Sequence, residues 1–133
     1  MKQEIAKNDH YEIYIDQVKN RFYIKLIGFW QYASEVPDYI DDHKKALGLL
    51  SSGFTVLTDS RTMKTPTTEI MELHGKGLQM LNDAKMSKLA LVVDQLIVGF
   101  AGKRATREAG VGEQTGQFND VKEAEDWLDG KDV

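Results

Sequence analysis

The chain has 133 residues, no cysteine, and 17 Lys and Arg side chains against 21 Asp and Glu side chains, a net charge of −4. This length suits one domain over residues 1–133. The lack of cysteine excludes disulfides, thiolate metal ligands and a cysteine nucleophile. Residues 119–133 contain six acidic and two basic side chains, which is the whole imbalance. Because no basic stripe is present, the composition argues against nucleic-acid binding.

No targeting or cofactor motif is visible in the sequence. The N-terminal residues lead into no apolar segment, and no apolar run approaches the ~20 residues of a membrane-spanning helix. We therefore expect a cytoplasmic protein without a transmembrane segment. The sequence lacks a phosphate loop, a dinucleotide-binding fingerprint and a paired-histidine zinc motif, so we expect no cofactor and no metal site.

The first elements along the chain are a strand hairpin and a helix. Residues 11–16 alternate apolar and polar side chains as a half-buried strand does, and residues 22–30 form a more apolar strand. The link between them is too short for a crossover, which predicts an antiparallel pair. Ser34 is a favourable N-cap for a first helix, whose apolar repeat continues to about Leu50.

Buried strands and a helix alternate in the middle of the chain. Residues 54–58 are apolar and rich in β-forming residues, which predicts a central strand, and residues 59–65 are typical of a polar loop. Pro66 can open a second helix, because the N–H that it lacks would be unpaired in a first turn. The apolar stripe of this helix continues to Leu81, and residues 88–93 predict another buried strand.

The last third of the chain completes an alternating pattern. A third helix is predicted from Asp94 or Gln95 to residue 109, a weak strand over 114–118, and a fourth helix capped at residue 119 or 120. The order β-β-α-β-α-β-α-β-α predicts an α/β fold with a five-stranded mixed sheet and four helices.

Two aspartates are candidate ligand-binding residues, and in an alternative interpretation they are catalytic. Asp59 and Asp94 each follow a predicted parallel strand, and open α/β sheets bind ligands outside such strand ends, near a topological switch. Carboxylates there can bind a cation or act as acid and base. Asp is also common in turns and N-caps, where it hydrogen-bonds nearby backbone groups. The catalytic interpretation predicts a small hydrolase or isomerase that uses Asp59 and Asp94 with Arg61 or His43.

Two histidines lie on predicted helices beside apolar residues. His43 is on the apolar stripe of the first helix, and His74 follows Leu73 in the second. Each is either a titratable group that lines a pocket or a buried histidine with a satisfied hydrogen bond.

Three aromatic residues and one arginine are further candidates for ligand binding. Trp30 and Tyr32 follow the second strand, where aromatic side chains can ring an apolar pocket or close the core. Phe100 lies on the apolar face of the third helix. Arg104 can hold an anionic group, or it can complement the helix dipole from the last turns.

The order of elements resembles the STAS domain, the fold of sporulation anti-sigma-factor antagonists and of the tails of sulfate transporters. Residues 54–58, followed by a loop and a helix, look like the third strand and second helix of that family. The closing segment 118–128 is more similar to the divergent SpoIIAA-like branch, which is often discussed together with CRAL-TRIO lipid-carrier domains. The resemblance implies a binding or regulatory domain without catalysis.

The resemblance also implies a candidate phosphorylation site. In the antagonist family, an Asp-Ser-Ser-Gly segment opens the second helix, and a partner kinase phosphorylates its first serine. Aligned without gaps, this segment falls on Pro66-Thr67-Thr68-Glu69, so that Thr67 and Thr68 take the serine positions. The flanking Asp and Gly are replaced, but a hydroxyl remains at a helix N-terminus, where a phosphate is electrostatically favoured.

Two functional hypotheses follow. The first is a binding or regulatory module that carries a small apolar or anionic, lipid-like ligand, or that docks a protein partner. The pocket would lie between the sheet and its helices, with Trp30, Tyr32, His43 and Phe100 in its wall. The alternative is the hydrolase or isomerase. A homodimer is also conceivable, with three tyrosines (Tyr11, Tyr14 and Tyr23) covering the open edge of the hairpin.

Overall fold

The structure is a computed structural model that describes residues 2–131. It contains a six-stranded sheet and four α-helices, with short 3-10 turns at Ala33–Glu35 and Gly112–Gln114. The strands are β1 (Gln3–Lys7), β2 (Tyr11–Asp16), β3 (Arg21–Gly28), β4 (Thr55–Met63), β5 (Lys88–Val92) and β6 (Thr115–Phe118). The helices are α1 (Tyr39–Leu47), α2 (Thr68–Asp83), α3 (Leu96–Glu108) and α4 (Val121–Leu128).

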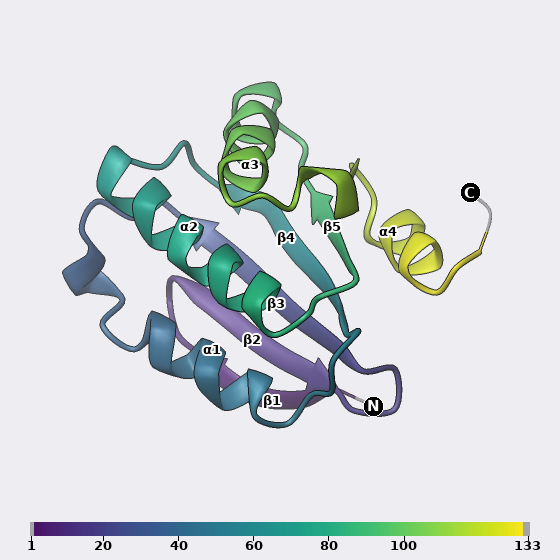
Figure 1. Ribbon diagram of the computed structural model, residues 1–133. Coiled ribbons are helices and arrows are strands. Elements are labelled where there is room, and N and C mark those ends of the chain that lie inside the picture. The colour runs from purple at the N-terminus through teal and green to yellow at the C-terminus, as the bar shows by residue number, and fades with distance from the viewer. Residues whose placement is uncertain (1, 132–133) are drawn as a thin grey trace.

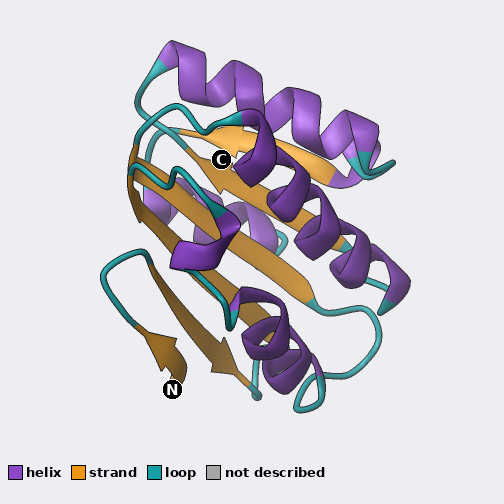
Figure 2. Cartoon of the chain, turned by 90° about the vertical axis from the view of Figure 1, so that its left-hand side faces the viewer, coloured by secondary structure: helices purple, strands orange, loops and turns teal. Residues whose placement is uncertain are grey.

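The strands lie in the sheet in the order in which they occur along the chain. The pairs β1–β2 and β2–β3 are antiparallel, and the pairs from β3 to β6 are parallel. Because parallel crossovers share one hand, α1, α2 and α3 cover the same face of the sheet. Figures 1 and 2 show these three helices on one face and α4 on the other.

This strand order removes the structural basis for a site between Asp59 and Asp94 at a topological switch. Ligands bind at a switch point because neighbouring crossovers leave on opposite faces and open a crevice. Within residues 2–131 the order of the parallel strands nowhere reverses, so no such crevice forms. Asp94 instead lines a surface pocket of about 210 Å³ after β5, together with Phe100 and Lys103 of α3, and Asp59 does not line this pocket.

The sheet separates two apolar cores. Val56 in β4 points toward α1 and α2 and packs with residues such as Ile70 and Leu81. Its neighbour Leu57 packs on the opposite face against Ala124 and Leu128 of α4. This alternation along β4 is the period-two pattern of a strand that is covered on both faces.

The sheet has one strand more than the sequence pattern predicts. The additional strand, β1, is mostly exposed, and Ile5 is its only buried side chain, so it carries little apolar signal. Because β1 pairs with β2, the edge that was expected for a homodimer is already occupied. Tyr11, which was expected at that edge, is buried under α1, and its hydroxyl donates to the Asp42 carboxylate at 2.5 Å.

Several predicted boundaries differ from the structure. Ser34 lies in a 3-10 turn instead of capping the first helix, which begins at Tyr39. Strand β4 continues to Met63, so Asp59 lies inside a strand and not in a loop. The second helix begins after Thr67, which is its N-cap, and not at Pro66.

Candidate functional site

A cavity of about 70 Å³ lies between the sheet and helices α1, α2 and α3. Its wall is mainly apolar and includes Leu26 and Leu91 from the sheet and Leu78 from α2. Six polar side chains also contribute to the wall: Tyr39, His43, Thr58, Ser60, His74 and Thr106. An apolar pocket with a few polar groups is the usual form of a small-molecule site.

His43 is held by its own helix. Its Nδ1 lies 2.7 Å from the backbone carbonyl oxygen of Tyr39, one turn earlier, and the two rings are 4.4 Å apart. A carbonyl oxygen can only accept, so Nδ1 carries the proton and donates. Burial lowers the pKa of His43, although the bond to the Tyr39 carbonyl opposes this effect. The imidazole is therefore neutral near pH 7, and its Nε2 is an acceptor.

Gly77 of α2 lies opposite His43. A Cβ atom built on Gly77 would stand 3.2 Å from the His43 Nε2 and 3.3 Å from the Tyr39 ring. The glycine thus lets α2 approach α1 closely without covering the imidazole. His43 Nε2 makes no hydrogen bond to any residue between 2 and 131.

His74 brings a second imidazole to the cavity, from α2. Its Nδ1 lies 3.0 Å from the Tyr39 hydroxyl. The Tyr39 hydroxyl makes no other hydrogen bond in the described part of the chain, so we assign its proton to this bond, with Nδ1 as the acceptor. Burial raises the pKa of Tyr39, which keeps its hydroxyl protonated. Burial likewise lowers the pKa of His74 to about 4, so this imidazole is neutral and carries its proton on Nε2.

The Nε2 atom of His74 is buried without a hydrogen-bond partner among the residues that the structure describes. The hydroxyls of Thr58 and Ser60, both on β4, also pair with none of these residues. By contrast, the Thr106 hydroxyl donates within α3 to backbone carbonyls of the preceding turn. The cavity wall therefore contains several polar groups whose hydrogen-bonding capacity is free.

A groove between α2 and α3 adjoins the cavity. Its volume is about 810 Å³, and its wall includes Thr68, Lys76, Phe100 and Arg104. Four residues line both the groove and the cavity: Pro66, Met71, Ala101 and Ala105. These shared residues place the cavity next to the surface groove.

The structure brings only one of the four predicted pocket residues, His43, to the cavity. Trp30 is buried behind the cavity, where its ring lies 5.1 Å from the His74 ring and its Nε1–H donates to the Ile27 carbonyl. Tyr32 is exposed. Phe100 and Arg104 lie together in the groove, where Arg104 pairs with Glu108.

Asp59 lies on the face of the sheet opposite the cavity. It alternates with Thr58 and Ser60, which line the cavity, so its side chain points toward the α4 side, as does Leu57. Both carboxylate oxygens accept bonds of 2.9 Å from the Arg61 guanidinium. Burial alone would raise the pKa of Asp59, but the bonds from Arg61 hold it below its usual range.

The proposed catalytic group is therefore split by the sheet. His43 and Asp59 lie on opposite faces and cannot act on one substrate. The pKa of Arg61 is raised mainly by its hydrogen bond to Asp59. The charge of Asp94, which follows β5, contributes less to the same shift. Among the described residues Arg61 forms its ion pair with Asp59 and none with Asp94, so this pair does not join the two aspartates in one site. Within residues 2–131, no cluster of three acidic or histidine side chains could hold a metal ion.

Thr67 and Thr68, the candidate phosphorylation sites, lie at the start of α2. The Thr67 hydroxyl accepts a hydrogen bond of 3.3 Å from the Ile70 N–H and donates to the Gln31 carbonyl at 3.0 Å. It thus caps α2 and also ties the helix to the segment that follows β3. Thr68 is exposed at the groove.

His74 was considered from the sequence either as a pocket-lining group or as a satisfied buried histidine, whereas Thr58 and Ser60 were missed. His74 and His43 do share one signal, because each follows the apolar stripe of a helix that packs on the same face. Thr58 and Ser60 are two positions apart, so in a strand their side chains point to the same face. Because a loop was predicted after residue 58, this shared face could not be recognised from the sequence.

Comparison with protein-family models gives no match, and comparison with curated proteins gives none either. Among solved structures, the chain is similar to a protein of Shewanella loihica PV-4, described as an uncharacterized DUF3478-family protein with a SpoIIAA-like fold. The two chains share 14% identity with a TM-score of 0.65, over 92% of this chain and 97% of the other. None of the helices in the described residues is long and apolar enough to cross a membrane. The chain therefore has a SpoIIAA-like fold, in agreement with the order of its predicted elements.

Proposed function

We propose that this domain is a binding module that carries a small, largely apolar molecule in the cavity between the sheet and α1–α3. One observation carries the proposal: His74 lines the cavity, and its Nε2 is buried without a hydrogen-bond partner among the described residues. A buried polar group that lacks a hydrogen bond costs about 1–3 kcal/mol. A bound molecule that supplies the missing partner recovers this free energy.

The groove between α2 and α3 is the route by which such a molecule would enter. The residues that line both spaces, and therefore lie on this route, are two alanines of α3, Met71 of α2 and Pro66 before that helix. Alanine side chains leave space between packed helices, and methionine changes rotamer easily. A ligand with a longer apolar chain would extend along this route toward Phe100.

Native mass spectrometry of the freshly purified protein, without delipidation, tests this proposal. We expect a low-mass adduct that is lost when the protein is denatured. The variant Gly77→Ala, which places a methyl group beside His43, should reduce the adduct, whereas Gly75→Ala, in the same helix with open space at its Cβ, should retain it. An adduct that both glycine variants retain equally would contradict the cavity as the site.

A further inference from the structure

The two histidines at the cavity present opposite hydrogen-bonding groups. The Tyr39 hydroxyl donates to His74 Nδ1, which leaves the proton of the neutral imidazole on Nε2, a donor. The His43 Nδ1–H donates to the Tyr39 carbonyl, which leaves His43 Nε2 as an acceptor. Tyr39 thus sets both tautomers, one through its side chain and one through its backbone.

The surroundings of these groups disfavour a charged ligand. Burial lowers the pKa of both histidines, and Tyr39 is held protonated, so the cavity wall contains no cation at neutral pH. A carboxylate taken into this apolar space would be an uncompensated buried charge, which is far more costly than a neutral polar group.

The size of the cavity limits the part of a ligand that fits inside. A cavity of about 150 Å³ binds benzene, and this cavity measures about 70 Å³. The part of the ligand that fits inside is therefore smaller than a benzene ring, on the order of three non-hydrogen atoms, which is the size of an amide or carboxyl group.

We infer that the cavity selects a small uncharged group that carries both a hydrogen-bond acceptor, for His74 Nε2–H, and a hydrogen-bond donor, for His43 Nε2. A short-chain primary amide or an undissociated carboxylic acid has this chemistry. The hydroxyls of Thr58 and Ser60 can take either role toward the same group. The inference rests on the proposed function and names the chemical class of its ligand.

Two isosteric probes measure how much the hydrogen-bond donor of the ligand contributes to binding. Propionamide and 2-butanone have the same arrangement of non-hydrogen atoms and both carry a carbonyl acceptor. An NH₂ group in the amide replaces a CH₃ group in the ketone, so only the amide donates. Each would be titrated into the protein with ¹³C-labelled methyl groups, while shifts are followed at Leu78 and Leu91 in the cavity wall. Leu57 and Leu128, on the α4 face, serve as the internal reference. We expect propionamide to bind about five- to tenfold more tightly, the difference that one net hydrogen bond produces.

Variants then assign each bond to its histidine. His43→Phe removes the acceptor, so the two probes should bind equally, at the affinity that 2-butanone has for the unmodified protein. His74→Leu removes the donor that both carbonyls use, so both probes should bind about fivefold more weakly. His10→Gln is the matched control, because His10 is partly exposed beside Glu35 and should leave both affinities unchanged.

Imidazole ¹⁵N spectra of the unmodified protein provide a test that requires no variant to fold. We expect the proton on Nδ1 of His43 and on Nε2 of His74. The reverse tautomers, or equal binding of the two probes by the unmodified protein, would overturn this inference while leaving the cavity a binding site. If neither probe shifts the methyl groups of the cavity wall, the proposed function itself fails.

Discussion

The Tyr39 hydroxyl and the Nδ1 of His74 lie 3.0 Å apart, across the contact between α1 and α2. This bond determines what His74 offers to the cavity, because it fixes the imidazole proton on the opposite nitrogen. It also joins two helices that otherwise meet through apolar side chains. The arrangement satisfies one nitrogen of a buried histidine and leaves the other without a partner in the described chain.

Acid should destabilise the protein before its carboxylates protonate. The pKa of His74 falls from 6.5 to about 4 on folding, so the unfolded chain binds a proton that the folded chain excludes. Stability should be fully present above pH 6.5 and decrease as the pH falls toward 4. The contribution between pH 7.5 and 5 is about 2 kcal/mol, and it is measured by urea unfolding at each pH.

The double variant Tyr39→Phe with His74→Leu tests the origin of this slope. It replaces both hydrogen-bonding partners with apolar groups of similar shape, so it should fold and lose the part of the slope above pH 5 that His74 contributes. His43, whose pKa burial also lowers, keeps its own part. Asp59 and Asp129, whose pKa values are lowered by folding, affect stability only at lower pH. An unchanged slope in the double variant would show that another group binds the proton.

Two glycines of α2 should respond in opposite ways to the same substitution. Gly75→Ala places a Cβ in open space and should stabilise the protein by about 0.5–1 kcal/mol, because alanine is the better helix former. Gly77→Ala forces the His43 and Tyr39 rings to move and should be about 1–2 kcal/mol less stable than Gly75→Ala. Urea unfolding compares them, and equal stabilities would contradict the close contact at Gly77.

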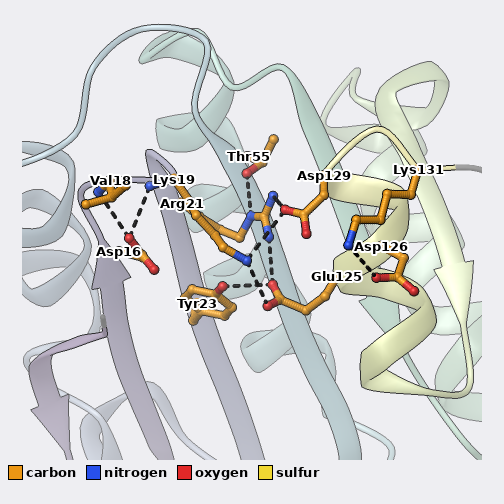
Figure 3. A network of polar contacts seen from close by, with 10 residues as sticks. All are labelled: Asp16, Val18, Lys19, Arg21, Tyr23, Thr55, Glu125, Asp126, Asp129 and Lys131. Atoms are coloured by element: carbon orange, nitrogen blue, oxygen red, sulfur yellow. Dashed lines mark hydrogen bonds and ion pairs between the residues drawn. The ribbon is translucent and has the colours of Figure 1, made fainter.

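The α4 helix is fixed to the sheet by a buried arginine. Arg21 of β3 donates to Thr55, Glu125 and Asp129 at 2.8–2.9 Å, and Glu125 also accepts from the Tyr23 hydroxyl (Figure 3). Its guanidinium is 3% exposed, whereas the two carboxylates are about a quarter exposed.

Removal of Arg21 should therefore lower the stability of the fold. Arg21→Ala leaves Glu125 and Asp129 with Lys19, at 3.6–3.7 Å, as their only cationic partner in the described residues, and it should lower the free energy of unfolding by about 2–3 kcal/mol. Arg104→Ala removes an exposed pair with Glu108 and should change it by less than about 0.5 kcal/mol. Similar urea midpoints for the two variants would mean that the Arg21 contacts contribute no more than a surface ion pair does.

Substitution of Thr67 should lower the free energy of unfolding more than substitution of Thr68 does. Thr67→Ala removes the N-cap of α2 and should cost about 1 kcal/mol, whereas Thr68→Ala, at an exposed first-turn position, should change stability by less than about 0.5 kcal/mol. Thermal unfolding compares the two. Equal effects would show that the bonds of the Thr67 hydroxyl are not formed in solution.

Phosphorylation of Thr67 or Thr68, with a kinase partner that docks there, stays a prediction of the family resemblance. The intact mass of protein purified with phosphatase inhibitors tests it. A mass increase of one phosphate at Thr67 would support the switch, and it would also remove the hydroxyl proton that now bonds to Gln31. An unmodified mass would argue against this switch in that preparation.

The order of the elements was predictable because most strands and helices carry a strong apolar period. β1 was missed because an edge strand with one buried side chain has almost no such period. The polar residues 59–63 looked like a loop, but in the folded sheet Asp59 is paired with Arg61 and lies beside Lys25 of β3. Pairing with the neighbouring strand therefore makes this polar segment a strand, which the local sequence does not indicate.

The candidate site was harder to predict for a similar reason. A histidine on an apolar stripe has the same spacing whether its nitrogens are satisfied or free, so the sequence could not separate His74 from an ordinary core residue. The distinction comes from Tyr39, which is 35 positions away and uses its only proton on one nitrogen. Trp30 was expected in the pocket, but its bond to Ile27 places it in the core.

Xenon titration monitored by methyl NMR tests most directly whether the cavity can hold a ligand. Xenon binds apolar cavities without needing a polar partner, so it tests the space independently of the histidines. We predict saturable shifts at Leu78, Leu91 and Val98 in the cavity wall, with Leu57 on the α4 face unchanged. Shifts at Leu57 alone, or no saturable shift at the cavity wall, would contradict a binding site between the sheet and α1–α3.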